Sequence, residues 1–149
     1  MTAPVVLVVN GPNLNLLGDR EPDIYGTTAL PDIVADLTRD AQQLSLRIDH
    51  VQSNHEGEIV DAIQGARGRC AAIIVNAGAF THYSWAIHDA LAAYEGYVVE
   101  VHLSNPYARE SWRHDSVITP VADGSICGLG SSGYALALQA VAQHLGQTG

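Results

Sequence analysis

Short runs of β-branched and other apolar residues alternate along this chain with segments of helical periodicity, and this alternation restricts the possible folds. The runs are "VVLVV" at 5–9, "LRIDHV" at 46–51, "AAIIV" at 71–75, "YVVEV" at 97–101 and "SICGL" at 125–129. Strands that alternate with helices are typical of a parallel sheet with crossover helices. The pattern therefore predicts five parallel strands.

The first helix is the clearest of the four that the pattern predicts. One apolar stripe at three- and four-residue spacing is made by Leu30, Ile33, Val34, Leu37, Ala41 and Leu44. We expect Thr28 to cap this helix and Pro31 to lie in its first turn.

The other three helices complete a single domain. Ser53 and Glu56 have capping-box spacing for a helix at about 55–66. Two further helices are expected at 85–94 and 132–145. The whole chain, 1–149, is thus predicted to be one α/β domain: a flavodoxin-like, doubly wound, five-stranded parallel sheet with helices on both faces.

The charge balance narrows the functions to consider. The formal charge is −9, and lysine is absent. Such a chain is a poor partner for nucleic acid or an anionic membrane, so we expect neither. Without lysine, a Schiff-base mechanism and a phosphate loop with a lysine are excluded.

Three features predict a cytoplasmic setting. No apolar run approaches the ~18 residues of a membrane span, and the start "MTAP" lacks the basic residues of a secretory signal. The two cysteines, Cys70 and Cys127, lie in apolar surroundings and are expected to be buried, reduced thiols.

Polar side chains gather where the predicted strands end. A parallel sheet of this kind binds its ligand beyond the carboxyl ends of its strands. Those positions hold Asn10, Asn13 and the ranges 52–55, 76–82 and 102–113. Arg20, Arg109 and Arg113 lie in the two longest polar loops. We therefore expect a local positive pocket that suits a small anionic ligand.

Two side chains at this edge have acid–base chemistry. His102 follows the fourth strand directly, and period-two alternation places Glu100 on the same side, where its carboxylate would orient the imidazole. Tyr25 follows Arg20 in a loop with Pro22 and Gly26. A free phenol has a pKa of about 10, so a tyrosine base needs nearby arginines to favour its anion. Purely structural roles for His102 and Tyr25 are the alternatives.

Other motifs favour less specific interpretations. "NHEGE" at 54–58, with His50, His55 and His82, lacks the paired ligand spacing of zinc sites, so no metal is expected. "GLGSSG" at 128–133 matches G-x-G-x-x-G, but a dinucleotide site also needs a strand and an acidic residue about 20 positions on. Sixteen residues follow Gly133, so we interpret the motif as a tight turn. We also expect neither cysteine beside a histidine at this edge, which argues against a hydrolase or transferase.

Five segments together resemble one enzyme family. "NGPNLNLLGDREPDIYG", "QSNHEGEIVDAI", "NAGAFTHYSWAIHDAL", "EVHLSNPYARESWR" and "GLGSSGYALAL" are similar, in order and spacing, to the type II 3-dehydroquinate dehydratases. The resemblance covers about 5–145. It implies a hydro-lyase that converts 3-dehydroquinate to 3-dehydroshikimate by anti elimination through an enolate, under a lid at about 18–27.

The resemblance also implies residue roles. Tyr25 would be the general base, and His102 the general acid. The implied catalytic set is Tyr25, His102, Arg20, Asn13, Glu100 and Arg109, and the implied substrate-binding set is Asn76, His82, Asp89, Leu103, Ser104 and Arg113. Asp89 would reach a neighbouring subunit of a homododecamer, a tetramer of trimers. No cofactor and no metal are implied.

The sequence departs from the family pattern without losing an assigned residue. The departures are Phe80, Tyr83, Trp85, Pro106, Trp112 and Asp115. The competing hypothesis is a non-catalytic flavodoxin-like module that binds a small anionic metabolite. It predicts the loss of Tyr25, Arg20 or His102, and all three are present.

Overall fold

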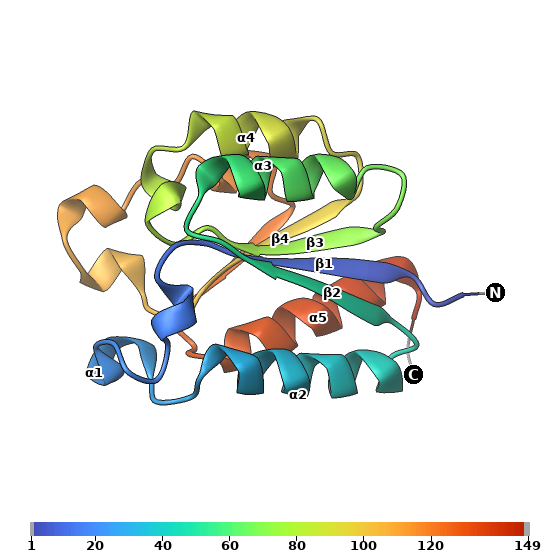
Figure 1. Ribbon diagram of the computed structural model, residues 1–149, viewed down its shortest axis with the longest axis horizontal. Coiled ribbons are helices and arrows are strands. Elements are labelled where there is room, and N and C mark those ends of the chain that lie inside the picture. Colours follow the sequence, from blue (N-terminus) through green and yellow to red (C-terminus); the bar gives the residue numbers. More distant parts are fainter. Residues whose placement is uncertain (1, 148–149) are drawn as a thin grey trace.

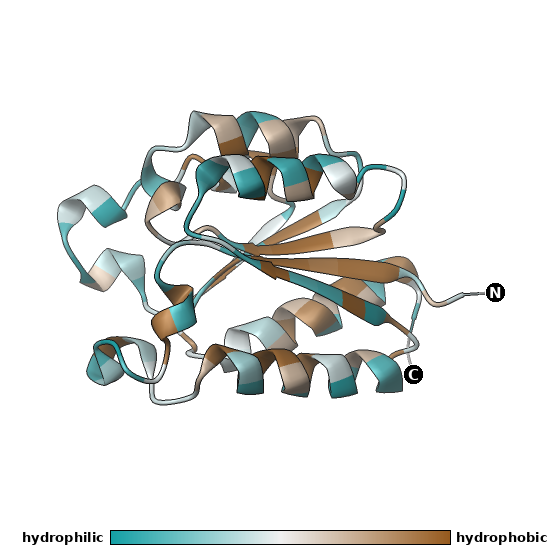
Figure 2. Ribbon diagram, viewed as in Figure 1, coloured by the Kyte–Doolittle hydropathy of each residue, from teal (hydrophilic) through white to brown (hydrophobic). Residues whose placement is uncertain are grey.

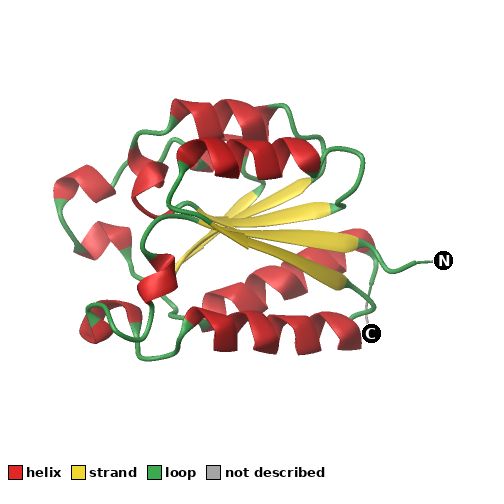
Figure 3. Cartoon of the chain, in the orientation of Figure 1, coloured by secondary structure: helices red, strands yellow, loops and turns green. Residues whose placement is uncertain are grey.

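The β-branched runs form one parallel sheet in the computed structural model, which describes residues 2–147 (Figures 1 and 3). Its strands are β1 (Val5–Asn10), β2 (Arg47–Gln52), β3 (Ala72–Asn76), β4 (Tyr97–His102) and β5 (Gly124–Cys127). They lie in the order β2-β1-β3-β4-β5, and every neighbouring pair is parallel. The predicted fold class is confirmed.

Helices cover both faces of the sheet. The α-helices are α1 (Pro22–Tyr25), α2 (Leu30–Gln43), α3 (Glu56–Gly65), α4 (Trp85–Ala92) and α5 (Ser132–Leu145). Short 3-10 helices are η1 (Leu14–Leu16), η2 (Gly78–His82), η3 (Pro106–Ala108), η4 (Ser111–Arg113) and η5 (Thr119–Val121). Figure 1 shows α2 and α5 on one face and α3 and α4 on the other. None of the helices within 2–147 has the length and apolar character of a membrane span.

Strand β1 shows why the sheet is buried on both sides. Val6 and Val8 pack into the cluster beneath α2 and α5, whereas Leu7 and Val9 pack into the cluster beneath α3 and α4. Successive side chains of a strand point to opposite faces, so a strand covered on both faces is apolar throughout. The apolar strands between two helical layers are visible in Figure 2.

Helix capping differs from our expectation at two helices. Ala29, not Thr28, precedes the first residue of α2, and no side chain caps it, although Pro31 does lie in the first turn. Helix α3 follows His55, so Ser53 lies too early to cap it, and its Oγ instead donates to Glu58 (2.7 Å). The predicted capping box is therefore wrong.

Glu56, the other member of that expected box, serves a neighbouring helix. It accepts a hydrogen bond from the hydroxyl of Ser84. That hydroxyl in turn accepts from the backbone N–H of Ile87 (3.1 Å) and so caps α4.

Two of the connections at the carboxyl ends of the strands are long, and the described chain ends lie at the opposite edge (Figure 1). The connection from β1 to α2 contains η1 and α1, and that from β4 to β5 contains η3, η4 and η5. Gly18 and Gly26 have φ of 97° and 87°, a region that glycine enters at low cost. These two connections bring most of the candidate residues to one edge.

Candidate active site

A cavity of about 70 Å³ opens at the carboxyl edge of the sheet. Among the sequence-predicted residues, its lining includes Asn13, Arg20, Tyr25, Asn76, His82, His102, Leu103, Ser104, Arg109 and Arg113. The lining also includes residues to which the sequence analysis assigned no catalytic or binding role, namely Pro12, Leu14, Gly78, Ala79 and Pro106. Residues from the connections after β1, β3 and β4 therefore share one pocket.

Two guanidinium groups lie over the ring of Tyr25. The Cζ atoms of Arg20 and Arg109 are 4.9 and 5.1 Å from the centroid of its ring. Arg109 is held by a hydrogen bond from Nη1 to Ser104 Oγ (3.1 Å). Arg20 forms only a 3.6 Å pair with the exposed Glu21, and such surface pairs contribute little. Positive charge is thus concentrated around one phenol in an acidic protein.

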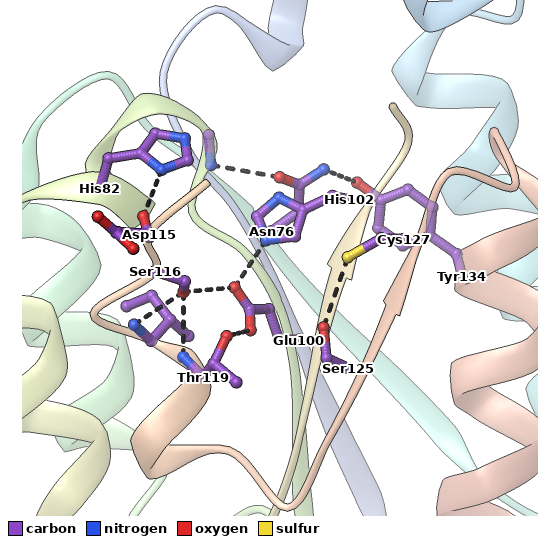
Figure 4. Close-up of polar contacts among 12 residues, drawn as sticks. Asn76, His82, Glu100, His102, Asp115, Ser116, Thr119, Ser125, Cys127 and Tyr134 are labelled. Carbon is purple, nitrogen blue, oxygen red and sulfur yellow. Dashed lines mark hydrogen bonds and ion pairs between the residues drawn. The ribbon is translucent and has the colours of Figure 1, made fainter. Parts of the chain in front are cut away.

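His102 ends β4 and is held from behind by Glu100. Its Nε2 lies 2.6 Å from Glu100 Oε2, as period-two alternation predicted (Figure 4). Glu100 is only 1% exposed. Burial by itself raises the pKa of this carboxyl, but hydrogen bonds from His102, Thr119 and Ser116 outweigh burial and leave the pKa below its ordinary value. Glu100 is therefore a buried carboxylate that orients the imidazole.

Asn76 is positioned by a buried tyrosine of α5. Its Nδ2 donates to Tyr134 Oη (3.1 Å), and that hydroxyl donates to Asn10 Oδ1 (2.5 Å). Asn10 and Asn76 are adjacent in register at the ends of β1 and β3. Burial raises the pKa of Tyr134, so its hydroxyl stays protonated and can donate. The phenol ties two strand ends together beneath the cavity.

We expect Tyr134→Phe to lower the free energy of unfolding by about 1–3 kcal/mol, because Oδ1 of Asn10 and Nδ2 of Asn76 are buried and each loses the hydrogen bond to Tyr134. Urea unfolding followed by circular dichroism measures this change. Tyr83→Phe is the matched control, since Tyr83 is 59% exposed. Equal stability of the two variants would contradict this account of Tyr134.

His82 enters the cavity from η2. Its Nδ1 pairs with the backbone carbonyl of Asp115 (2.8 Å), and its ring meets the ring of Trp112 edge-on, with centroids 5.4 Å apart. Burial is the largest cause of a pKa below the ordinary value for His82. Two of the departures from the family pattern, Trp112 and Asp115, thus contact this histidine. Arg113 Cζ lies 4.1 Å from the Trp112 ring centroid.

Asn13 occupies a backbone conformation that suits its type. Its φ of 68° lies in the left-handed region, which asparagine tolerates better than most residues. Its backbone N–H donates to Asn54 Oδ1 (3.0 Å). This turn directs the chain from β1 into the segment that carries Arg20 and Tyr25.

Some predicted residues lie outside the cavity. Asp89 is exposed on α4 and does not line it. The range 52–55 lies at the same edge, where Gln52 Nε2 donates to Gly11 O (3.1 Å), but it too is absent from the lining. Within 2–147, no three His, Cys, Asp or Glu residues are grouped as metal ligands would be.

The structure corrects our expectation for Cys127. This residue ends β5 and pairs in register with His102 (Figure 4). Both residues line a second, smaller cavity, which shares His82, Pro106 and Arg113 with the first. The expectation that neither cysteine lies near an edge histidine is therefore wrong for Cys127. The register between β4 and β5, which the sequence does not display, aligns the two residues. Burial raises the pKa of the Cys127 thiol, which disfavours the nucleophilic thiolate.

The sequence analysis missed the residues that hold the site from behind. Ser116, Thr119 and Tyr134 contact Glu100 or Asn76. Their sequence separations from those partners are 16, 19 and 58. No periodic signal connects residues so far apart.

Comparison with known proteins identifies close relatives. The model of the family described as "Dehydroquinase class II" matches residues 4–142. A 3-dehydroquinate dehydratase of Synechococcus sp. (strain CC9605) is 56% identical over 140 residues, which cover 94% of this chain and 96% of the relative.

Solved structures agree with this match. A type II dehydroquinase from Propionibacterium acnes has a TM-score of 0.92 and 41% identity, covering 95% of this chain and 98% of the other. One from Butyrivibrio crossotus has a TM-score of 0.91 and 43% identity, covering 93% and 97%.

Proposed function

The chain belongs to the class II dehydroquinase family and is a hydro-lyase of the shikimate pathway that dehydrates 3-dehydroquinate, and we propose that it does so with a tyrosine base, an enolate intermediate and a histidine acid. One observation carries the proposal. Tyr25 with two guanidinium groups, and His102 with its carboxylate, line the same cavity from different elements.

Tyr25 is the base in this mechanism. Its phenolate takes the C2 proton of 3-dehydroquinate, and the electron pair of the broken C–H bond moves into the enolate. Arg20 and Arg109 lie about 5 Å from the ring, where positive charge favours an anion. Fixed cations beside a site of developing negative charge lower the barrier. Removal of the proton by Tyr25 requires no covalent imine with the substrate, which agrees with a chain that contains no lysine.

His102 completes the elimination. The enolate collapses, the C1–O bond breaks, and His102 gives its proton to the departing hydroxyl so that water leaves. Glu100 accepts from Nε2–H of His102, so the proton that His102 transfers is the one on Nδ1, and the ring carries a proton on both nitrogens when it acts as the acid. A carboxylate behind an imidazole fixes its tautomer and balances its positive charge.

The remaining cavity residues bind the substrate in this proposal. They are Asn76, His82, Leu103, Ser104 and Arg113, and Asn13 positions a water or the enolate oxygen. Arg113 supplies a cation, and Leu103 and Ser104 begin the segment after His102, where backbone N–H and hydroxyl groups suit the substrate carboxylate. Residues 18–27, which include Arg20 and Tyr25, act as the lid.

We also propose the family's assembly for this chain, trimers grouped into a homododecamer. Asp89 then reaches the site of a neighbouring subunit. Its exposure on α4 supports this role, as does the large exposed side chain of Trp85, the first residue of the same helix. Exposed aromatic side chains are enriched at interfaces between subunits.

Turnover in the presence of borohydride tests the proposed function. We expect ultraviolet absorbance of the conjugated enone product to rise when purified protein meets 3-dehydroquinate. We expect the same rate after borohydride treatment, because no imine forms that the reagent could trap. Loss of turnover only in the treated sample would contradict the enolate route. No product from folded protein would favour a binding module instead.

A further inference from the structure

Both carboxylate oxygens of Glu100 are occupied by donors. Oε2 accepts from His102 Nε2 (2.6 Å) and from Ser116 Oγ (2.8 Å), and Oε1 accepts from Thr119 Oγ1 (2.5 Å) (Figure 4). At 1% exposure, this carboxylate has almost no access to water that could replace a lost partner. Its orientation therefore depends on the two hydroxyl groups.

The hydroxyl of Ser116 is itself held in one direction. Its oxygen accepts from the backbone N–H groups of Ile118 (3.1 Å) and Thr119 (3.0 Å). A serine hydroxyl has one proton and two acceptor positions, so the proton that remains is directed to Glu100. The segment is anchored to η2 by a bond from Val117 N to Thr81 O (2.8 Å). The donor pair is therefore part of the folded framework.

We propose that Ser116 and Thr119 are positioning residues for the dehydration, which act through Glu100 to hold His102 in the orientation that proton transfer from Nδ1 requires. The inference rests on the proposed role of His102. Neither residue lines the cavity around Tyr25, so neither is expected to touch the substrate.

An ionised carboxylate can only accept hydrogen bonds, and this property explains how the two hydroxyl groups act on Glu100. With a hydroxyl donor on each oxygen, Glu100 stays ionised and receives the Nε2 proton, so Nδ1 faces the substrate. Without one donor, Glu100 protonates more readily or rotates away from the ring. Either change weakens the hydrogen bond at Nε2, so that Nδ1 no longer faces the substrate in part of the population.

The first test uses Thr119→Val, which keeps the shape of the side chain and removes its hydroxyl. We expect kcat to fall about tenfold, the factor for one hydrogen bond to a charged group. KM should stay within about twofold, because the substrate contacts remain. Thr119→Ser is the matched control and should restore kcat. Ser116→Ala should lower kcat in the same way and provides a second variant should Thr119→Val fold poorly.

The pH dependence of kcat distinguishes a positioning role of Ser116 and Thr119 from a general loss of rigidity in the site. Removing a donor raises the pKa of Glu100, so the acid limb of kcat should move to higher pH. The other titratable or charged groups that face Glu100 or line the cavity beside it are the same in every variant; they are His82, His102, Tyr107, Arg113, His114 and Cys127. A uniform fall in kcat with an unmoved acid limb would overturn the inference.

Nuclear magnetic resonance of the ring nitrogens of His102 tests the inference without a measurement of turnover. In ¹⁵N-labelled protein whose His102 ring is neutral, we expect a single Nε2–H tautomer in the unaltered chain and a mixture in Thr119→Val, because the contact with Glu100 selects the nitrogen that points away from the substrate. An unchanged tautomer and wild-type kcat in Thr119→Val, together with loss of turnover in His102→Asn, would overturn this inference alone. Full turnover in His102→Asn would instead overturn the proposed role of His102 as the acid.

Discussion

Replacement of Tyr25 by phenylalanine is expected to lower kcat by about 100- to 10,000-fold, the usual contribution of a general base. The change removes one oxygen and leaves the ring beside Arg20 and Arg109. Substrate binding should therefore be largely intact. Product absorbance measures turnover, and calorimetric titration with 3-dehydroquinate measures affinity.

Tyr83→Phe is the control for this experiment. Tyr83 is 59% exposed and does not line the cavity, so removal of its hydroxyl should leave kcat unchanged. Thermal unfolding of both variants separates loss of chemistry from loss of fold. Near-normal turnover in folded Tyr25→Phe would rule out the tyrosine base.

The second large effect is expected for His102→Asn. Asparagine has no proton that it can transfer at neutral pH, so kcat should again fall by about 100- to 10,000-fold. Its side-chain amide can still donate to Glu100 and keep the buried carboxylate partnered. The loss should therefore appear in kcat more than in stability, as steady-state kinetics and urea unfolding will show.

His144→Asn is the matched control for the histidine. His144 is exposed near the end of α5 and stacks on Tyr97, with ring centroids 4.0 Å apart, away from the cavity lining. It should retain full turnover. If His102→Asn also turned over at the normal rate, water or another residue would have to protonate the leaving group.

The fold was predictable because its signals are local. Helix α5 spans Ser132–Leu145 as expected, between a glycine-rich turn and Gly146. Helix α4, in contrast, ends at Ala92, before the predicted end at residue 94. We attribute the earlier end of the helix to a tertiary contact. The hydroxyl of the buried Tyr94 donates to Cys70 O (2.7 Å), and the backbone at Tyr94 no longer continues the helix. The predicted capping box of α3 failed for a similar reason, because Ser53 and Glu56 have partners elsewhere.

The cavity was predictable in part. Parallel strands end at one edge, so polar residues after each strand could be expected to meet there. The Glu100–His102 pair followed from period-two alternation within one strand. The contacts of Ser116, Thr119 and Cys127 did not follow, because they depend on how the connection after β4 folds back and on the register of β5.

The amino-acid sequence by itself determined the α/β class, the absence of an imine route and the residue types at the strand ends, because periodicity and composition are properties of the chain. Only the tertiary structure decided that Arg20 and Tyr25, from the connection after β1, lie beside Arg109, from the connection after β4. Strand order places β3 between those two strands. That order results from burying both apolar faces of the sheet at once, which no local segment specifies.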